Sequence, residues 1–367
     1  MKLHTPTLMD VATHAGVSTA TVSRCLNFPD KVTAKTRERV MATVAELGYA
    51  PHFGARAMVT QRTNTIGAVI PTMENAIFAR GLQAFQEELG AHGFNLMVAS
   101  SSYQRELEVQ QVHSLVARGA DALLLIGHIR DPEIYPFLEK QGVPALVTWT
   151  FDPQADRPSI GFNNRTAMRD MARKVIGSGH RHLAMLAAPL ARNARAQGRL
   201  LGLKEAMEEA GLNSSHLHLI ERPYGIENGA TAFAELIDQD RPPTAIFCGN
   251  DVLAVGALRR AREMAVDVPG DVSIIGFDDI ELSQVTHPML TTVHVPHREM
   301  GKQAARMLVR HLVDGGPLES KELATELRLR ASLGPAKQAC PPLCRTPRQC
   351  ACRRRQSPRS ALSPTRY

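Results

Sequence analysis

Residues 7–27 read TLMDVATHAGVSTATVSRCLN, and this stretch decides the fold of the N-terminal end. Thr7 and Asp10 resemble a capping box, which predicts the start of a first helix, and Gly16 is typical of the position just past a helix end. Ser18 is a favoured N-cap, so a second helix is expected over TATVSRCLN. Two short helices joined by a glycine-containing turn form a helix-turn-helix.

The second helix of such a motif enters the DNA major groove and presents its N-terminal residues to base edges. In this chain those residues are Thr19, Ala20 and, one turn later, Arg24. Arginine can bind guanine through two parallel hydrogen bonds, and threonine or alanine methyl groups can contact a thymine methyl. Short polar side chains on the same stretch suit phosphate contacts; they are Ser18, Thr21, Ser23 and Asn27. The alternative is a small helical domain with ordinary caps and solvated charges.

The N-terminal end is also basic. A third helix is predicted after Thr33, over residues 34–47. The whole chain has 367 residues and a formal net charge of +7, but residues 1–62 alone hold eight basic and four acidic side chains. Residues 334–367 hold eight basic side chains and no acidic one, which leaves a net charge of −5 for residues 63–333. A basic head on an acidic body favours nucleic-acid contact at the N-terminal end.

From residue 63 the pattern changes to apolar runs that alternate with amphipathic stretches. Continuous apolar runs of this length are typical of parallel strands buried on both faces. Repeated strand–helix alternation predicts parallel sheets covered by helices, and the length suits two such sheets. The candidate strands are 65–71, 95–100, 122–127, 145–149, 183–188, 218–221, 245–250 and 273–278.

Polar and aromatic side chains follow several of these strands. In open α/β sheets, ligands bind outside the carboxyl ends of the strands, so these residues are the candidates for a ligand site. They are Thr72, Glu74, Asn75, Trp149, Asn250, Asp251, Asp278 and Asp279. A ring such as that of Trp149 can stack on a sugar face.

The head motifs, DVATHAGVSTATVSRCLN followed by KVTAKTRERVMATVAELGYAPHFGARAM, resemble the LacI/GalR family of bacterial transcription regulators. The resemblance extends to about residue 333. It implies an α/β protein with a small all-α helix-turn-helix head and a two-subdomain, periplasmic-binding-protein-like body with parallel sheets. The implied divisions are a DNA-binding domain (1–50), a hinge helix or linker (51–62), an effector-binding and dimerisation domain (63–333) and a basic disordered tail (334–367).

The resemblance also assigns residues. Met58 lies where the family usually has the apolar side chain that the hinge helix wedges into the minor groove, and Arg56 lies near phosphate. Three residues match family positions of the ligand site, Arg199, Asn250 and Asp278, and Phe162, a further candidate, lies near the hinge strands. Trp149 falls where some members have a ligand-binding acid. The segment around Arg192 and Arg195 departs from the family pattern, and its added arginines suit an anionic ligand.

The function implied is a ligand-responsive repressor of sugar or sugar-acid metabolism genes. Its partners would be a palindromic operator in double-stranded DNA, a second copy of the chain, and an effector. The effector would be a sugar, a sugar acid such as gluconate, or a sugar phosphate, because AVIPTMENAIFARGL resembles the gluconate-repressor branch. The ligand could act as an inducer or as a corepressor.

Two other functions compete with regulation: a cytoplasmic sugar-binding protein and a sugar-acting enzyme. The sequence lacks the phosphate-binding and nucleophile motifs of common enzymes, so no catalytic residue, no cofactor and no metal is expected. The N-terminus has no secretory pattern and no apolar run approaches membrane-spanning length, so a cytoplasmic protein is expected.

The C-terminal tail has no Val, Ile, Phe, Met or Trp after Pro335, so it is expected to be disordered. It could be a nonspecific DNA-binding arm. It could instead be a metal site built from Cys340, Cys344, Cys350 and Cys352, although their spacing lacks the paired C-x2-C of common zinc sites. The third interpretation, which we favour, is an extension with no selected role.

Overall fold

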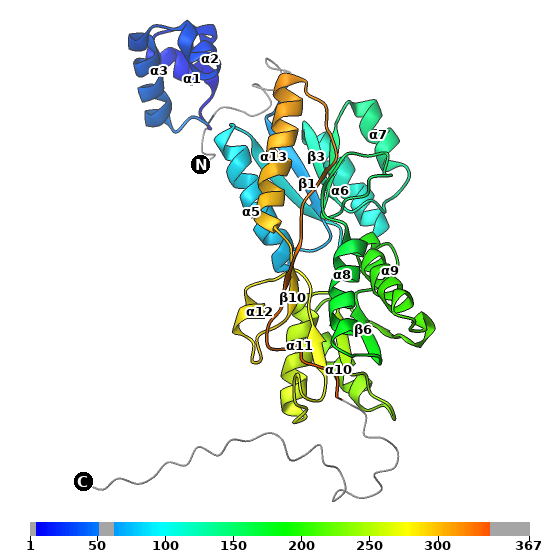
Figure 1. The fold of residues 1–367 in the computed structure, drawn as a ribbon. Coiled ribbons are helices and arrows are strands. Elements are labelled where there is room, and N and C mark those ends of the chain that lie inside the picture. Colours follow the sequence, from blue (N-terminus) through cyan, green and yellow to red (C-terminus); the bar gives the residue numbers. More distant parts are fainter. Residues whose placement is uncertain (1–4, 51–61, 338–367) are drawn as a thin grey trace, which may run out of the picture. The chain divides into compact units, whose positions relative to one another are not determined.

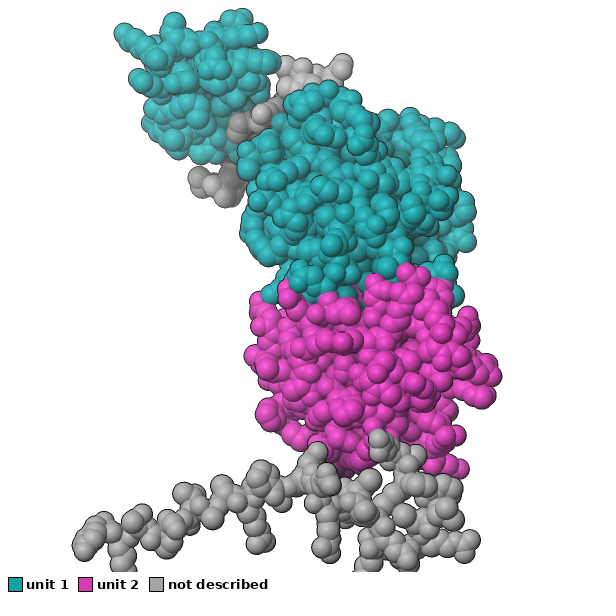
Figure 2. Space-filling view, viewed as in Figure 1, with its two compact units in different colours: residues 1–168, 188–202, 293–326 teal, residues 169–187, 203–292, 327–367 magenta. Residues whose placement is uncertain are grey.

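The computed structural model describes residues 5–50 and 62–337. A helical head precedes an α/β body (Figure 1). The chain divides into two compact units, coloured separately in Figure 2. The first comprises residues 1–168, 188–202 and 293–326, and the second comprises residues 169–187, 203–292 and 327–367. None of the helices within the described ranges is long and apolar enough to cross a membrane.

The head consists of three helices, α1 (Leu8–Ala15), α2 (Thr19–Asn27) and α3 (Ala34–Leu47), with a short 3-10 turn, η1 (Pro29–Lys31), between the last two. The predicted capping box is confirmed: the Asp10 carboxylate accepts the Thr7 N–H at 2.8 Å, and the Thr7 hydroxyl accepts the Asp10 N–H at 3.3 Å. Gly16 ends α1 with a φ of 62°, a conformation that favours glycine. Val11, Val22 and Val40, one from each helix, are fully buried together.

One cap in the head differs from the expectation. Thr33 precedes α3, but its side chain makes no hydrogen bond to the helix backbone. The Thr33 hydroxyl instead lies 3.0 Å from the hydroxyl of Thr36. The residue type of Thr33 therefore predicted where α3 begins, but it did not predict that the Thr33 hydroxyl would pair with the Thr36 hydroxyl.

The first unit of the body is built on a six-stranded sheet in the order β11-β5-β4-β3-β1-β2, with all neighbours parallel. Val69, Leu123 and Leu125 on one face pack against buried side chains of α6 and α7. Helix α13 contacts β3, β4 and β5 and packs closely against α5, where Gly301 leaves no room for a side chain beside the backbone of Gly81. The elements of this unit are β1 (Thr65–Ile70), α5 (Ala76–Ala91), β2 (Asn95–Ser100), α6 (Arg105–Ala117), β3 (Ala122–Ile126), α7 (Ile134–Gln141), β4 (Ala145–Thr148), β5 (Ser159–Gly161), α13 (His297–Asp314) and β11 (Lys321–Glu322).

The second unit is built on a four-stranded parallel sheet in the order β7-β6-β8-β9. Its core includes Phe233, Ile246 and Leu253, all fully buried. The elements are β6 (Leu183–Ala187), η2 (Ser214–His216), β7 (His218–Glu221), α10 (Ile226–Ile237), β8 (Ala245–Cys248), α11 (Asp251–Glu263), β9 (Ser273–Ile275) and α12 (Leu282–Val285). The chain passes between the units within α8 (Asn164–Gly177), α9 (Ala194–Glu209), β10 (Thr292–His294) and β12 (Glu326–Arg328), the last two of which pair as a two-stranded sheet.

All eight strands predicted from apolar runs are present, and the α/β fold class is confirmed. Strands β8 and β9 are shorter than predicted, because the chain turns at Asn250 to start α11 and turns again at Asp278. The prediction missed β5, β10, β11 and β12, which have only two or three residues each. Runs this short carry no periodicity that a sequence pattern can reveal.

Candidate DNA-binding surface and effector-binding residues

Helix α2 has a buried face and an exposed face, and the exposed face carries the predicted base contacts. Val22 and Cys25 are buried in the head core, whereas Ala20 and Arg24 are exposed and Thr19 is half-buried. The Arg24 guanidinium makes no hydrogen bond or ion pair to any residue that the structure describes, so its donors are available to a base edge or a phosphate.

The short polar residues predicted to contact phosphate have local hydrogen bonds. The Ser18 hydroxyl accepts the Thr21 N–H at 3.2 Å and lies 2.9 Å from the Thr21 hydroxyl, so Ser18 caps α2 and Thr21 bonds to the cap. The Asn27 amide donates to the Ser23 hydroxyl at 3.3 Å. Arg56 and Met58 lie outside the described residues, as does most of the predicted hinge, so their roles remain predictions.

In the first unit, four residues are linked by hydrogen bonds that run through three side chains and through both the indole and the backbone carbonyl of Trp149. The indole N–H of Trp149 donates to Nδ1 of His297 at 3.2 Å, and the carbonyl of Trp149 accepts from the Asn164 amide at 3.2 Å. The Asn164 carbonyl oxygen then accepts from Nε of Arg199 at 2.9 Å. All four residues are at least nine-tenths buried. The guanidinium of Arg199 is therefore fixed in orientation by α8 and by the end of β4.

The ring of Trp149 is packed within the first unit. Phe78 contacts it edge-on, with ring centroids 5.4 Å apart, and a side chain at Gly81 would collide with it. Trp149 is only 1% exposed and has a φ of 59°, an unusual conformation for a large residue. The indole thus has a packing role, and the Trp149 carbonyl positions Asn164. Phe162 follows β5, is equally buried, and its carbonyl accepts the Phe151 N–H at 3.0 Å.

Two predicted ligand residues, one in each unit, carry buried amide groups that lack a partner. Asn75 caps α5, because its side-chain oxygen accepts the Ile77 N–H at 3.3 Å. Asn250 caps α11, because its side-chain oxygen accepts the Leu253 N–H at 3.0 Å. Both residues are at least 95% buried, and neither side-chain NH₂ has a hydrogen-bond partner in the described part of the chain. A buried donor without an acceptor is costly, and it is a position where a ligand oxygen is expected.

The adjacent residues Asp278 and Asp279 have different environments. Asp279 is held by an ion pair to Arg330 at 2.7 Å and by the Ser283 hydroxyl at 3.0 Å, so its charge is compensated within the second unit. Asp278 is 1% exposed and has a φ of 107°, an uncommon backbone conformation of the kind that clusters at functional sites. The two carboxylates thus belong to different environments, and of the two we keep Asp278 as the candidate ligand group.

Asp251, beside Asn250, has a structural role that its position in the sequence did not reveal. Its carboxyl group accepts the Ile280 N–H at 2.8 Å and the Thr292 hydroxyl at 2.6 Å, which ties α11 to two later segments of the second unit. Burial, and secondarily the neighbouring Asp278 carboxylate, raise the pKa of Asp251 well above its usual range. A neutral side chain therefore suits this position.

We expect Asp251→Asn to change the free energy of unfolding by less than about 1 kcal/mol, and Asp251→Ala to lower it by about 2–3 kcal/mol. An asparagine can accept the Ile280 N–H and donate to the Thr292 hydroxyl, whereas alanine leaves both groups buried without a partner. Folding raises the pKa of Asp251, so the stability of wild type should fall as pH rises from the pKa in the unfolded chain to the pKa in the folded protein. The asparagine variant does not titrate at this position and should not show this fall in stability. Urea unfolding at several pH values measures both effects; an asparagine variant as unstable as the alanine variant would contradict this role.

The structure therefore divides the predicted effector residues between the two units. Asn75, Trp149, Phe162 and Arg199 belong to the first, and Asn250 and Asp278 follow neighbouring strands of the second. Sequence reasoning did not single out Asn164, His297 or Phe78 as supports of this site. Asn164 lies after β5, a strand too short to be predicted, and His297 lies 148 residues further along the chain than Trp149, so the strand pattern revealed neither residue.

Together these features define a class: a helix-turn-helix DNA-binding protein whose body is a two-unit small-molecule receptor. Comparisons with known proteins agree. The family model described as "Bacterial regulatory proteins, lacI family" matches residues 7–52, and the model of a "Periplasmic binding protein-like domain" matches residues 172–333. The transcriptional repressor CytR of Escherichia coli K12 is 32% identical over 331 residues, which cover 89% of this chain and 96% of that protein.

Solved structures are also similar. The lac repressor dimer bound to operator and the anti-inducer ONPF aligns with a TM-score of 0.80 at 27% identity, covering 90% of this chain and 100% of that one. The regulator CelR in complex with cellobiose aligns with a TM-score of 0.64 at 28% identity, covering 89% and 99% of the two chains. The chain belongs to the LacI family of bacterial transcription regulators.

Proposed function

We propose that this chain is a repressor of sugar or sugar-acid metabolism genes that binds a palindromic operator as a homodimer. The proposal rests on two features of one chain: α2 exposes an Arg24 that has no partner among the described residues, and the strand ends of the body present buried amides at Asn75 and Asn250 that also lack one there. One part is suited to read DNA and the other is suited to bind a small polar molecule.

The proposed division of labour follows the sequence. Residues 1–50 bind DNA, residues 51–62 form the hinge that orders on the operator, and residues 63–333 bind the effector and the second subunit. We assign no role to residues 334–367. Two identical half-site readers require a symmetric dimer on a pseudo-palindromic site. The protein would act in the cytoplasm, where bacterial DNA lies.

Ligand and operator binding are coupled in this proposal. A ligand changes the operator affinity only if it binds the DNA-competent and DNA-incompetent states with different affinities, and DNA must then change ligand affinity by the same factor. The proposed effector contacts are Asn75, Trp149, Phe162 and Arg199 in the first unit and Asn250 and Asp278 in the second. CelR is described with cellobiose, a neutral sugar, which makes a carbohydrate the first class of effector to test.

The experiment that tests the proposal starts from a random pool of DNA duplexes. Selection with the full-length protein should recover a palindromic sequence, and anisotropy titrations should then show an operator affinity that changes with one member of a sugar and sugar-acid panel. A sugar-binding protein without regulatory function would bind the panel member but select no sequence. An enzyme would convert the panel member, which chromatography of the incubated mixture detects.

Met58→Asp tests the proposed hinge. We expect this variant to lose operator binding, because a carboxylate cannot wedge between bases and is repelled by the phosphates. Ligand binding measured by calorimetry without DNA should be unchanged, since Met58 lies in the hinge and not in the body. Met41→Asp, at an exposed position on α3, is the matched control for the introduced charge and should lose less operator affinity. Full operator affinity in the Met58 variant would refute the wedge.

A further inference from the structure

Three arginines occur within eight residues at the start of α9. Arg192 precedes the helix with a left-handed φ of 60°, and Arg195 and Arg199 lie one turn apart on the same side of it. Arg199 is bonded to Asn164, as described above. Arg195 is 6% exposed, yet it has no hydrogen bond or ion pair to any residue within 5–50 or 62–337. Its only recorded contact of this kind is with the ring of Phe78, whose centroid lies 5.2 Å from the guanidinium carbon.

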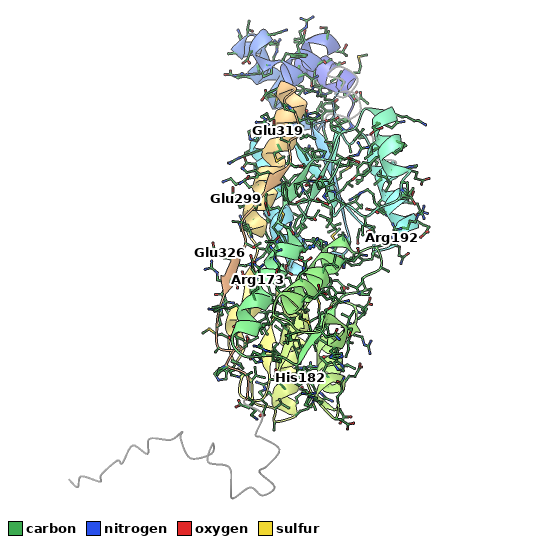
Figure 3. The ribbon with its side chains drawn as sticks, turned by 45° about the vertical axis from the view of Figure 1, so that its right-hand side comes forward. Arg173, His182, Arg192, Glu299, Glu319 and Glu326 are labelled. Atoms are coloured by element: carbon green, nitrogen blue, oxygen red, sulfur yellow. The ribbon has the colours of Figure 1, made fainter. Side chains whose placement is uncertain are left out.

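Arg195 lines a small pocket that lies entirely within the first unit. The pocket opens at the carboxyl ends of β1, β2 and β3, where Pro71, Ser101 and Gly127 form its floor, and the segment 192–195 closes it from the other side. Arg192, labelled in Figure 3, is exposed at its rim. The pocket volume of about 40 Å³ has room for a few waters or one small polar group, and not for a whole sugar ring.

The other charges around the pocket are already matched. Nη1 of Arg130 lies 3.1 Å from the Glu108 carboxylate, and Arg105 pairs with Asp131. Burial raises the pKa of Glu108, and the positive charges of Arg130 and Arg192 offset that rise only in part. Arg192 makes no hydrogen bond or ion pair to the described residues. Arg192 and Arg195 are thus two arginines at one small pocket that make no ion pair with the described residues.

An arginine in the position of Arg195 requires an acceptor. The guanidinium has five N–H donors and stays charged at any physiological pH, and contact with an aromatic ring supplies no hydrogen-bond acceptor. The Arg195 nitrogens keep some exposed surface in the pocket, so their donors are accessible to a ligand. Carboxylate and phosphate match the planar fork of a guanidinium through two parallel hydrogen bonds.

We propose that this pocket is an anion subsite, in which Arg195 binds a carboxylate or phosphoryl group of the effector and Arg192 adds to the attraction at the rim. The inference rests on the proposed function, because it names the chemical class of the effector of that same site. The effector is then a sugar acid or a sugar phosphate, and the neutral part of the molecule extends beyond this pocket.

The test compares three full-length proteins: wild type, Arg195→Met, and Arg118→Gln as a matched control that removes an exposed arginine of the same unit. Melting temperatures are measured without ligand and with gluconate, glucose 6-phosphate, inorganic phosphate or glucose, at one ionic strength set with sodium chloride. Without ligand, we expect Arg195→Met to melt no lower than wild type, because Arg195 makes no hydrogen bond or ion pair to the described residues and methionine can keep an apolar contact with Phe78. If Arg195 serves only to stabilise the fold, the Arg195→Met variant should instead melt lower than wild type.

With ligand, at least one anion should stabilise wild type and Arg118→Gln but not Arg195→Met, and calorimetry should show a loss of about 30-fold in its affinity. If gluconate is the one anion with this effect, the subsite binds a carboxylate. If glucose 6-phosphate or inorganic phosphate has the effect, the subsite binds a phosphoryl group. The proposal is overturned if the anions act no differently from chloride, or if Arg195→Met responds to them as wild type does. If glucose alone both stabilises the protein and alters operator affinity, the anion subsite fails while the proposed regulatory function stands.

Discussion

Replacing Arg24 by alanine is expected to lower the affinity for the selected operator by about 1,000-fold. The Arg24 side chain is exposed on α2 and has no partner among the described residues, so its guanidinium can form two hydrogen bonds with guanine. Each such contact is worth about 1–3 kcal/mol, and a dimer on a palindrome makes it twice, so the losses add to about 4 kcal/mol. Anisotropy titrations with the selected duplex at one salt concentration measure the change.

The control for Arg24 is Arg39→Ala, which removes an exposed positive charge from α3 in the same head. This variant should lose only nonspecific, salt-sensitive attraction, with a change of less than about tenfold. The Arg24 variant should in addition tolerate base changes at one position of each half-site that wild type rejects. A uniform and small loss on all sequences would assign Arg24 to phosphate contact instead of base recognition.

Replacing Arg199 by methionine is expected to abolish the ligand response at concentrations that saturate wild type, with a loss of ligand affinity of about 100-fold. The side chain is 2% exposed and is held by Asn164, which in turn bonds to the Trp149 carbonyl, so its orientation is set before a ligand arrives. Hydrogen bonds from such a pre-oriented charged group are worth about 1.5–3 kcal/mol.

The Arg199 prediction is checked by titrating ligand into the protein–operator complex and locating the midpoint of the affinity change. Arg118→Gln again controls for the loss of a positive charge and should keep the wild-type midpoint. Circular dichroism establishes that the variant is folded. A wild-type midpoint in the Arg199 variant would remove this residue from the effector site, whatever the fate of the anion subsite at Arg195.

Much of the fold could be predicted because local sequence and final structure agree. The caps at Thr7, Gly16 and Ser18 use residues that satisfy helix ends by themselves. Six of the eight longer strands are largely buried and mostly apolar (β1, β3, β4, β6, β8 and β9), whereas the edge strands β2 and β7 are partly exposed. The short strands could not be predicted, because their pairing depends on distant partners: Lys321 and Glu322 pair with Ile160 and Gly161.

The candidate site was predictable only in part. Strand-end rules found Asn75, Asn250 and Asp278, since the carboxyl ends of parallel strands are brought to one edge by the topology. They did not find the hydrogen bond from Trp149 to His297, nor the role of Asp251 as a tie between α11 and later segments. These depend on long-range packing. The excess of arginines at 192–199 was visible in the sequence, but only the structure showed that Arg195 lines a pocket and makes no hydrogen bond or ion pair to the described residues.

The most direct test of a ligand-switched, DNA-binding regulator is one thermodynamic cycle on the full-length protein. Operator affinity is measured with and without the panel member that binds, and the affinity for that ligand is measured with and without operator. We predict that ligand changes operator affinity, and that operator changes ligand affinity, by the same factor of roughly 5 to 150, because coupling between two binding sites is reciprocal. A ligand that binds tightly while leaving operator affinity unchanged, with both factors equal to one, would contradict the account.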